Sequence, residues 1–210
     1  TCGLSEKYVG TWLRQRGRRD DIVLATKATG PGAHLPHIRH GKTQYNIKHL
    51  TAALDASLER LQSEYIDLYQ LHWPTDSVPI EETMGAMDKL VADGKVRHVG
   101  VSNFSVDQLR DAEQALGAGR VVTNQIKFSL LDHEFADEVV PYCRDHGVTI
   151  MSYSPLEEGA FQARIKERPR LATTIDAIAA EWQKTRAQVL LNWVLHEPNV
   201  MTIPRTNRVE

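Results

Sequence analysis

Short, continuous apolar runs recur along the chain and alternate with longer stretches in which apolar residues return every three or four positions. Continuous runs rich in valine, isoleucine and leucine are typical of parallel strands that are covered on both faces. The pattern therefore predicts six buried strands. They are expected at residues 22–25, 66–71, 96–101, 121–123, 148–151 and 200–203.

The longer stretches carry the periodicity of amphipathic helices. Between Leu50 and Leu61, four leucines are spaced so that they form one apolar stripe along a helix. Ser5 and Ser105 each stand where an N-cap is expected, because their hydroxyls can accept a hydrogen bond from the first helical turn. Helices are predicted at residues 5–16, 47–61, 81–92, 105–116, 135–146, 171–182 and 187–196.

The predicted order is one helix, five strand-helix pairs and a final strand, which is an α/β arrangement. An open doubly wound sheet and a closed barrel both fit, but the glycine-rich dinucleotide-binding signature follows none of the strands, which favours the barrel. No linker-like stretch divides the chain, so a single domain over residues 1–210 is expected. Because the chain opens inside a helical pattern and ends soon after its last strand, we expect a truncated barrel. Two strands and a helix would be missing in front and one helix behind.

Composition and charge exclude several classes of protein. The chain is 41% hydrophobic and 25% charged, which is ordinary for a globular protein, and its net charge of −2 indicates neither a nucleic-acid nor a membrane partner. It has no apolar stretch of the length of about 18 residues that a membrane span needs. The two cysteines, Cys2 and Cys143, do not form a disulfide framework, so a reducing compartment, the cytoplasm, is expected.

Polar side chains follow every predicted strand at its carboxyl end, where parallel α/β proteins gather their reacting groups. Lys27 could polarise a neighbouring acid or hydroxyl, and His72 could donate a hydrogen bond. Each also has a structural reading, as a strand-end lysine in solvent or a core histidine bonded to the backbone. The other polar groups could hold a ligand through amide pairing, ring stacking and phosphate binding. They are Ser102, Asn103, Gln125, Tyr153, Ser154, Arg205 and Thr206.

The chain resembles the aldo-keto reductase family in five motifs that follow the family's order. They are DLYQLHWP at 67–74, GKVR at 94–97, GVSNF at 100–104, YSPL at 153–156 and AQVLLNW at 187–193. The resemblance implies a (β/α)8 TIM barrel, of which about six of the eight strands are present. It also implies an NADPH-dependent oxidoreductase that reduces an aldehyde or ketone of a small molecule to an alcohol by hydride transfer.

The resemblance also assigns roles to individual residues. Lys27 and His72 match two members of the family's catalytic tetrad, and Trp73 would line the substrate pocket. The expected cofactor contacts are the carboxamide at Ser102, Asn103 and Gln125, the nicotinamide ring at Tyr153, the pyrophosphate at Ser154 and Leu156, and the 2′-phosphate at Arg205 and Thr206. The last pair favours NADPH over NADH.

Two features depart from the family's pattern. The tetrad aspartate and tyrosine belong before Thr1, and neither Tyr8 nor Tyr45 fits their motif, so residues 1–210 alone are expected to turn over poorly. Glu157 and Glu158 stand beside the expected pyrophosphate loop, where they would repel an anion unless they point outward. Substrate identity and oligomeric state are not readable from the sequence.

Two alternative functions stay open. A histidine cluster at His34, His37, His40 and His49 suggests a metal site, although its spacing resembles no compact zinc pattern, so no metal is expected. The protein could also be a catalytically weak member of the same fold that binds cofactor and senses redox state as a regulatory subunit.

Overall fold

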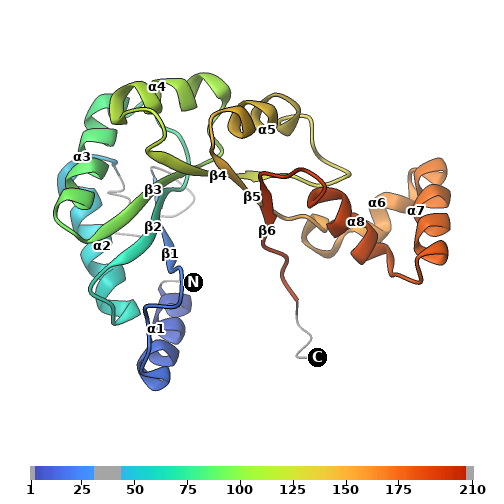
Figure 1. Cartoon of the computed structure of the whole chain (residues 1–210), viewed down its shortest axis with the longest axis horizontal. Coiled ribbons are helices and arrows are strands. Elements are labelled where there is room, and N and C mark those ends of the chain that lie inside the picture. Colours follow the sequence, from blue (N-terminus) through green and yellow to red (C-terminus); the bar gives the residue numbers. More distant parts are fainter. Residues whose placement is uncertain (1–2, 31–43, 207–210) are drawn as a thin grey trace. The chain divides into compact units, whose positions relative to one another are not determined.

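The computed structural model describes residues 3–30 and 44–206, and the cluster of His34, His37 and His40 lies outside them. The chain divides into two compact units, residues 1–122 and 123–210 (Figure 1). In both units parallel strands alternate with helices. Six strands are described, as the sequence predicted.

The first unit contains three neighbouring parallel strands and four helices. Strand β1 pairs with β2, and β2 pairs with β3. The elements in chain order are α1 (Leu4–Arg16), β1 (Ala25–Ala28), α2 (Ile47–Leu61), β2 (Ile66–Leu71), α3 (Ile80–Ala92), β3 (Val96–Ser102) and α4 (Val106–Leu116).

The second unit repeats the parallel pairing, with β4 against β5 and β5 against β6. Strand β4 begins at the border between the units. Three α-helices separate the last two strands, where the sequence predicted two. The elements are β4 (Val121–Lys127), α5 (Ala136–Asp145), β5 (Thr149–Tyr153), the short 3-10 helix η2 (Glu157–Gly159), α6 (Phe161–Lys166), α7 (Pro169–Glu181), α8 (Arg186–Val194) and β6 (Val200–Thr202).

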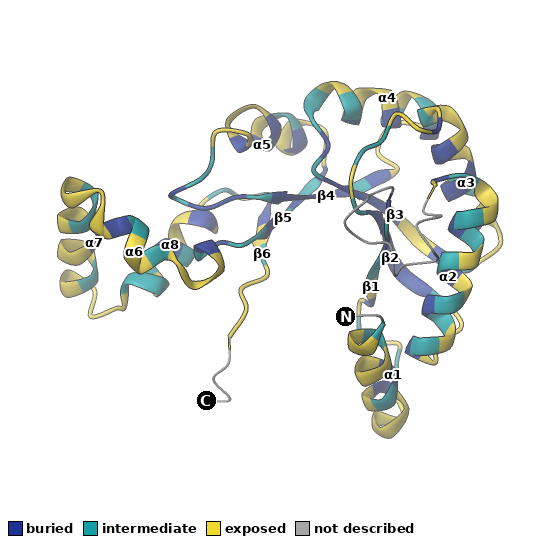
Figure 2. Ribbon diagram, turned by 180° about the vertical axis from the view of Figure 1, so that it is seen from behind, coloured by how far each residue is buried: buried dark blue, intermediate teal, exposed yellow. Residues whose placement is uncertain are grey.

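Most residues of β2, β3 and β4 are buried, whereas β1 and β6 are only partly so, and the helices expose their outer faces (Figure 2). All six residues of β2 are buried, including the polar Asp67 and Gln70, as expected for a parallel strand that is covered on both faces. In the second unit, Leu131, Ile165, Ile175 and Leu190 form a separate cluster that packs α6, α7 and α8 together.

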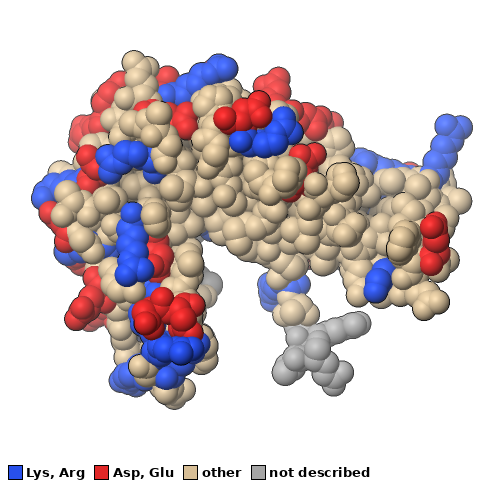
Figure 3. All heavy atoms as spheres, in the orientation of Figure 1, with Lys and Arg blue, Asp and Glu red and all other residues tan. Residues whose placement is uncertain are grey.

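No helix in the described part of the chain is long and apolar enough to cross a membrane. On the face drawn in Figure 3, basic and acidic side chains are interspersed.

Helix boundaries follow their capping chemistry. The Ser105 hydroxyl accepts a hydrogen bond from the Gln108 amide at 3.3 Å, and the Gln108 side chain accepts from the Ser105 amide at 3.0 Å, so the predicted cap of α4 is confirmed as a capping box. The prediction that Ser5 caps α1 is wrong. The cap is Gly3, whose φ of +80° suits a residue without a side chain, and Ser5 lies inside the first turn.

The prediction for the first strand is also wrong, because β1 begins at Ala25 rather than Ile22, and Val23 is 79% exposed. Side chains hold the predicted segment together with the main chain of β2, whose Asp67 and Leu68 amides both donate to the Leu24 carbonyl. Arg19 donates to the Ile22 carbonyl at 2.6 Å, and the Asp67 carboxylate accepts from the Leu24 amide at 2.8 Å. Lys27 therefore lies inside the strand and not after it.

Candidate active site

Lys27, His72 and Ser102 lie at the carboxyl ends of the three parallel strands of the first unit. Lys27 pairs with Gln70 in the register of β1 and β2, and Gln70 pairs with Gly100 in that of β2 and β3. His72 and Ser102 each follow two residues later, and side chains two residues apart share one face of a strand. The three side chains therefore belong to one face at one end of the sheet.

The environment of Lys27 changes its acidity. The residue lies within β1 and is partly buried, and burial lowers the pKa of its ammonium below the ordinary value for lysine. A charge withdrawn from water acts more strongly on its neighbours than one that is fully hydrated. Lys27 can therefore polarise a hydroxyl or carbonyl that is brought next to it.

The main chain of His72 is held on both sides. Its amide donates to the Ala28 carbonyl at 3.1 Å and also to the Tyr45 hydroxyl at 3.0 Å. Its carbonyl accepts from Asn103 Nδ2 at 3.3 Å. The rings of His72 and Trp73 contact each other at a tilt, with centroids 6.1 Å apart, and Trp73 is 46% exposed.

Ser102 and Asn103 form a polar pair after β3. Ser102 is buried, and Asn103 Nδ2 donates to its hydroxyl oxygen at 3.1 Å. Asn103 has a φ of +61°, a left-handed conformation that asparagine tolerates better than most residues. Its amide group is thus oriented by the two contacts before any ligand arrives.

In the second unit, Gln125 and Tyr153 share one face. Gln125 is buried inside β4, where the sequence placed it after the strand, and it pairs with Met151 of β5. Tyr153 ends β5 and follows Met151 by two residues. Burial raises the pKa of the Tyr153 hydroxyl, although the nearby charge of Lys127 opposes the rise, so the ring stays neutral near pH 7.

A pocket of about 600 Å³ opens between the loop after β5 and the segment after β6, both within the second unit. The exposed Arg205 belongs to its wall, and Thr206 follows in the chain. The full lining is Ser154, Pro155, Leu156, Glu158, Gly159, Ile203, Pro204 and Arg205.

The loop after β5 has a strained backbone. Ser154, Glu157 and Glu158 have φ values of +52°, +53° and +54°, which residues with side chains rarely adopt. Strain of this kind persists only where surrounding contacts hold it, and it gathers at functional sites.

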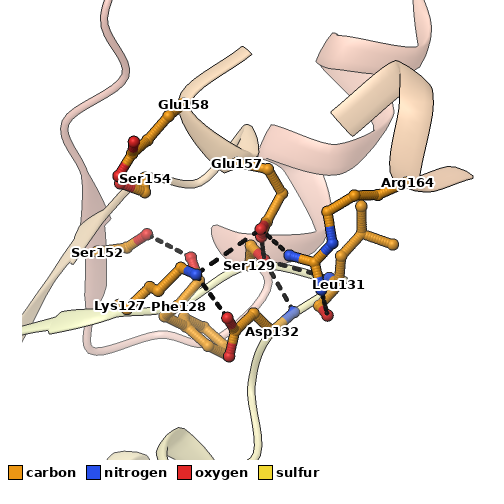
Figure 4. Close-up of polar contacts among 10 residues, drawn as sticks. All are labelled: Lys127, Phe128, Ser129, Leu131, Asp132, Ser152, Ser154, Glu157, Glu158 and Arg164. Carbon is orange, nitrogen blue, oxygen red and sulfur yellow. Dashed lines mark hydrogen bonds and ion pairs between the residues drawn. The ribbon is translucent and has the colours of Figure 1, made fainter. Parts of the chain in front are cut away.

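Glu157 supplies those contacts, and it points inward rather than outward. It is only 6% exposed, and it accepts hydrogen bonds from Ser129 and Arg164 (Figure 4). Lys127 Nζ lies 3.8 Å from it and 2.6 Å from Asp132. The hydrogen bond that Lys127 donates to the Asp132 carboxylate raises the pKa of Lys127, which keeps this lysine charged.

Glu158 differs from its neighbour, because it is exposed and its carboxylate lies 3.4 Å from the Ser154 hydroxyl. Sequence reasoning missed Tyr45, Ser129 and Arg164. The sequence did hold one indication of Ser129 and Arg164. Two adjacent glutamates beside a loop that is expected to bind an anion indicate that at least one of them is paired with another side chain. No such signal marks Tyr45.

The candidate residues thus fall into two groups. The first unit brings together Lys27, His72, Trp73, Ser102 and Asn103, and the second brings Ser154 and Leu156 to the same pocket as Arg205, with Gln125 and Tyr153 on the strands behind the loop. His49 lies on α2 in the first unit. Within the described residues, no three histidine, cysteine or acidic side chains gather as metal ligands would.

Known proteins resemble this chain over nearly its whole length. The model of the aldo/keto reductase family matches residues 2–210. Aldo-keto reductase YhdN of Bacillus subtilis is 31% identical over 220 residues, covering 93% of this chain and 64% of that protein. Methylglyoxal reductase YeaE of Escherichia coli is 34% identical, covering 97% of this chain and 65% of that protein. The chain therefore spans just under two thirds of the length of these relatives.

A solved structure shows the same likeness in three dimensions. The aldo/keto reductase from Klebsiella pneumoniae in complex with NADP and acetate has a TM-score of 0.80 and 33% identity, covering 97% of this chain and 66% of that chain. The strand-helix alternation is accordingly that of an incomplete (β/α)8 barrel, with six of the eight strands described. With these matches added to its five motifs, the chain belongs to the aldo/keto reductase family.

Proposed function

We propose that this protein is an NADPH-dependent oxidoreductase that reduces aldehydes or ketones of small molecules to alcohols. The observation that carries the proposal is the shared face of Lys27, His72 and Ser102 at the carboxyl ends of three parallel strands. Two similar proteins support the proposal. One is named as a methylglyoxal reductase, and the other, an aldo/keto reductase from Klebsiella pneumoniae, was crystallised with NADP.

The residues fit a nicotinamide cofactor. In the first unit the buried hydroxyl of Ser102 and the partly buried amide of Asn103 offer groups that suit a carboxamide, which both donates and accepts hydrogen bonds. In the second unit the buried amide of Gln125 offers the same chemistry. The neutral ring of Tyr153 can stack on a flat heterocycle. The pocket beside Ser154 and Leu156 is polar and contains one cation, Arg205, and with Thr206 this residue would bind a ribose 2′-phosphate.

NADPH, when bound, supplies the hydride. The chain's own residues then have to stabilise the charge that develops on the carbonyl oxygen. The His72 imidazole would donate a hydrogen bond to that oxygen, and Trp73 would line the pocket beside it. Lys27 would lower the pKa of the acid that protonates the oxygen, a tyrosine that the family's pattern places upstream of Thr1.

The decisive test replaces His72 with glutamine in the protein as its gene encodes it. Glutamine keeps an amide N–H but does not place it where the imidazole N–H lies. Losing one oxyanion donor costs about 10²–10³-fold in rate, so kcat for an aldehyde such as methylglyoxal should fall by that factor while the Kd of NADPH stays the same. The control is His98→Gln, because His98 is exposed on β3. Unchanged turnover in H72Q would refute the role of His72.

Two further measurements divide the remaining alternatives. Arg205→Ala should weaken NADPH binding far more than NADH binding, because only NADPH carries the 2′-phosphate. Tight NADPH binding with no turnover of any small carbonyl would instead favour a regulatory, redox-sensing protein.

Cys143 is fully buried and not in a disulfide, which supports the proposal that the protein works in the cytoplasm.

A further inference from the structure

We propose that Tyr45 is a positioning residue for His72, acting through a hydroxyl that joins the carboxyl ends of β1 and β2. This inference rests on the proposed role of His72. Tyr45 belongs to none of the motifs of the chain, and its sequence distance of 27 residues from His72 hides the contact.

The Tyr45 hydroxyl makes three contacts with main-chain groups. It accepts hydrogen bonds from the amide of His72 at 3.0 Å and from the amide of Trp73 at 3.3 Å. It also lies 3.3 Å from the carbonyl oxygen of Ala28, to which it donates. A single oxygen atom therefore ties the last residue of β1 to the two residues that follow β2.

The hydroxyl is itself fixed in place. Tyr45 is 1% exposed, and the next residue, Asn46, caps α2 by accepting from the His49 amide at 3.0 Å. On the other side, a Cβ atom at Gly30 would lie 2.4 Å from the Tyr45 oxygen. The close approach of the phenol thus requires the glycine, and the ring has little freedom to shift.

This arrangement completes the clamp on the His72 main chain. Asn103 holds the His72 carbonyl from the β3 side, and Tyr45 holds the His72 amide from the α2 side. An imidazole can act on a carbonyl only from the correct distance and direction, and a displacement of about 1 Å can cost about 10²-fold in rate. The hydroxyl of Tyr45 therefore contributes to catalysis without touching the substrate.

The experiment combines Tyr45→Phe with His72→Gln in the protein as encoded. Tyr45→Phe removes one oxygen atom and keeps the ring, so the fold persists. We expect kcat to fall about 10-fold, because the freed main chain shifts by less than 1 Å, while the Kd of NADPH remains unchanged. In the H72Q background the same substitution should change kcat less than 2-fold, because Tyr45 acts only through the imidazole.

Tyr69→Phe is the matched control, because Tyr69 is a fully buried tyrosine of β2 whose side chain belongs to the opposite face from Gln70. It should leave kcat within 2-fold of the parent. A second readout is hydrogen exchange at the Trp73 amide, which should accelerate at least 10-fold in Y45F and not in Y69F.

The possible outcomes separate the inference from the proposed function. If H72Q turns over normally, the proposed role of His72 fails. If H72Q is impaired but Tyr45→Phe costs the same factor in both backgrounds, or if Trp73 exchange is unchanged, only the positioning role of Tyr45 is overturned.

Discussion

Arg205 and Glu158 line the same pocket in the second unit, so a cation and an anion share the space proposed for the cofactor phosphates. The acid also lies 3.4 Å from Ser154 Oγ, a hydroxyl that the pyrophosphate would need. An incoming phosphate would be attracted by one of these side chains and repelled by the other.

Glu158→Gln should therefore tighten NADPH binding. We expect the Kd to fall about 3- to 10-fold at low salt, and less at high salt, because exposed charges are screened. Titration of the purified protein by fluorescence or calorimetry measures the change. Glu181→Gln, at an exposed position at the end of α7, should leave the Kd unaltered. Weaker binding in E158Q would instead mean that the carboxylate contacts the cofactor.

Glu157→Gln should have the opposite effect. The carboxylate that pairs with Arg164 and faces Lys127 holds three left-handed residues in place, and its loss should loosen the loop. Losing a buried charge-assisted contact costs about 1–3 kcal/mol, so we expect a lower urea midpoint and a higher Kd for NADPH. Glu158→Gln is the matched control for stability, since it changes an exposed acid in the same backbone conformation. Equal urea midpoints for the two variants would contradict the proposal that the Glu157 carboxylate holds the loop after β5 in place.

Asp67→Asn should lower stability at neutral pH and change its dependence on acid. Burial alone would raise the pKa of Asp67, but the hydrogen bonds from the Leu24 amide, Arg19 and Arg97 outweigh it and hold the pKa below its ordinary value. A lowered carboxyl pKa stabilises the fold above the unfolded value of 3.8, and the benefit is lost as pH falls through the folded pKa.

We therefore expect D67N to lose about 1.5–3 kcal/mol of unfolding free energy at pH 7, because the hydrogen bonds that Arg19 and Arg97 donate lose their charged acceptor. The difference in unfolding free energy between D67N and the parent should narrow as pH falls below the unfolded value of 3.8, where Asp67 of the unfolded parent protonates, and should disappear once pH passes the lowered pKa of the folded state. Denaturant titrations at several pH values measure both effects. Asp111→Asn, on the exposed side of α4, is the control, and a gap that stays constant down to pH 2 would sink the argument.

Lys27→Arg should remove an alkaline limb from the pH profile of kcat. Burial lowers the pKa of Lys27, so the ammonium loses its proton below the ordinary lysine value of 10.5, and activity that needs the charge falls as pH rises through that lowered pKa. Arginine stays charged over this range. Lys27→Met should lose about 10²–10³-fold at all pH values, while Lys89→Met, an exposed lysine of α3, should lose nothing. An unchanged limb in K27R would assign it to another group.

Local patterns predicted most of the elements. The bounds of α2 and β2 were predicted to the residue, and the Ser105 cap was predicted because hydrophobic periodicity and capping depend on residues only a few positions apart. Polar residues that face a site break the apolar pattern, and for this reason the sequence ended the fourth strand at Thr123 although β4 continues to Lys127.

Pairings between distant residues had no local signal. The later start of β1 than predicted is associated with Asp67, whose carboxylate accepts a hydrogen bond from the Leu24 amide 43 residues before it. The inward orientation of Glu157 is associated with Ser129, which lies 28 residues before it and donates to its carboxylate. A sequence specifies which residues must be buried, because burial leaves a periodic trace along each element. Which polar group meets which is decided only when the strands align, since the hydroxyl of Tyr45 reaches His72 through the register of β1 and β2 and not through any spacing in the chain.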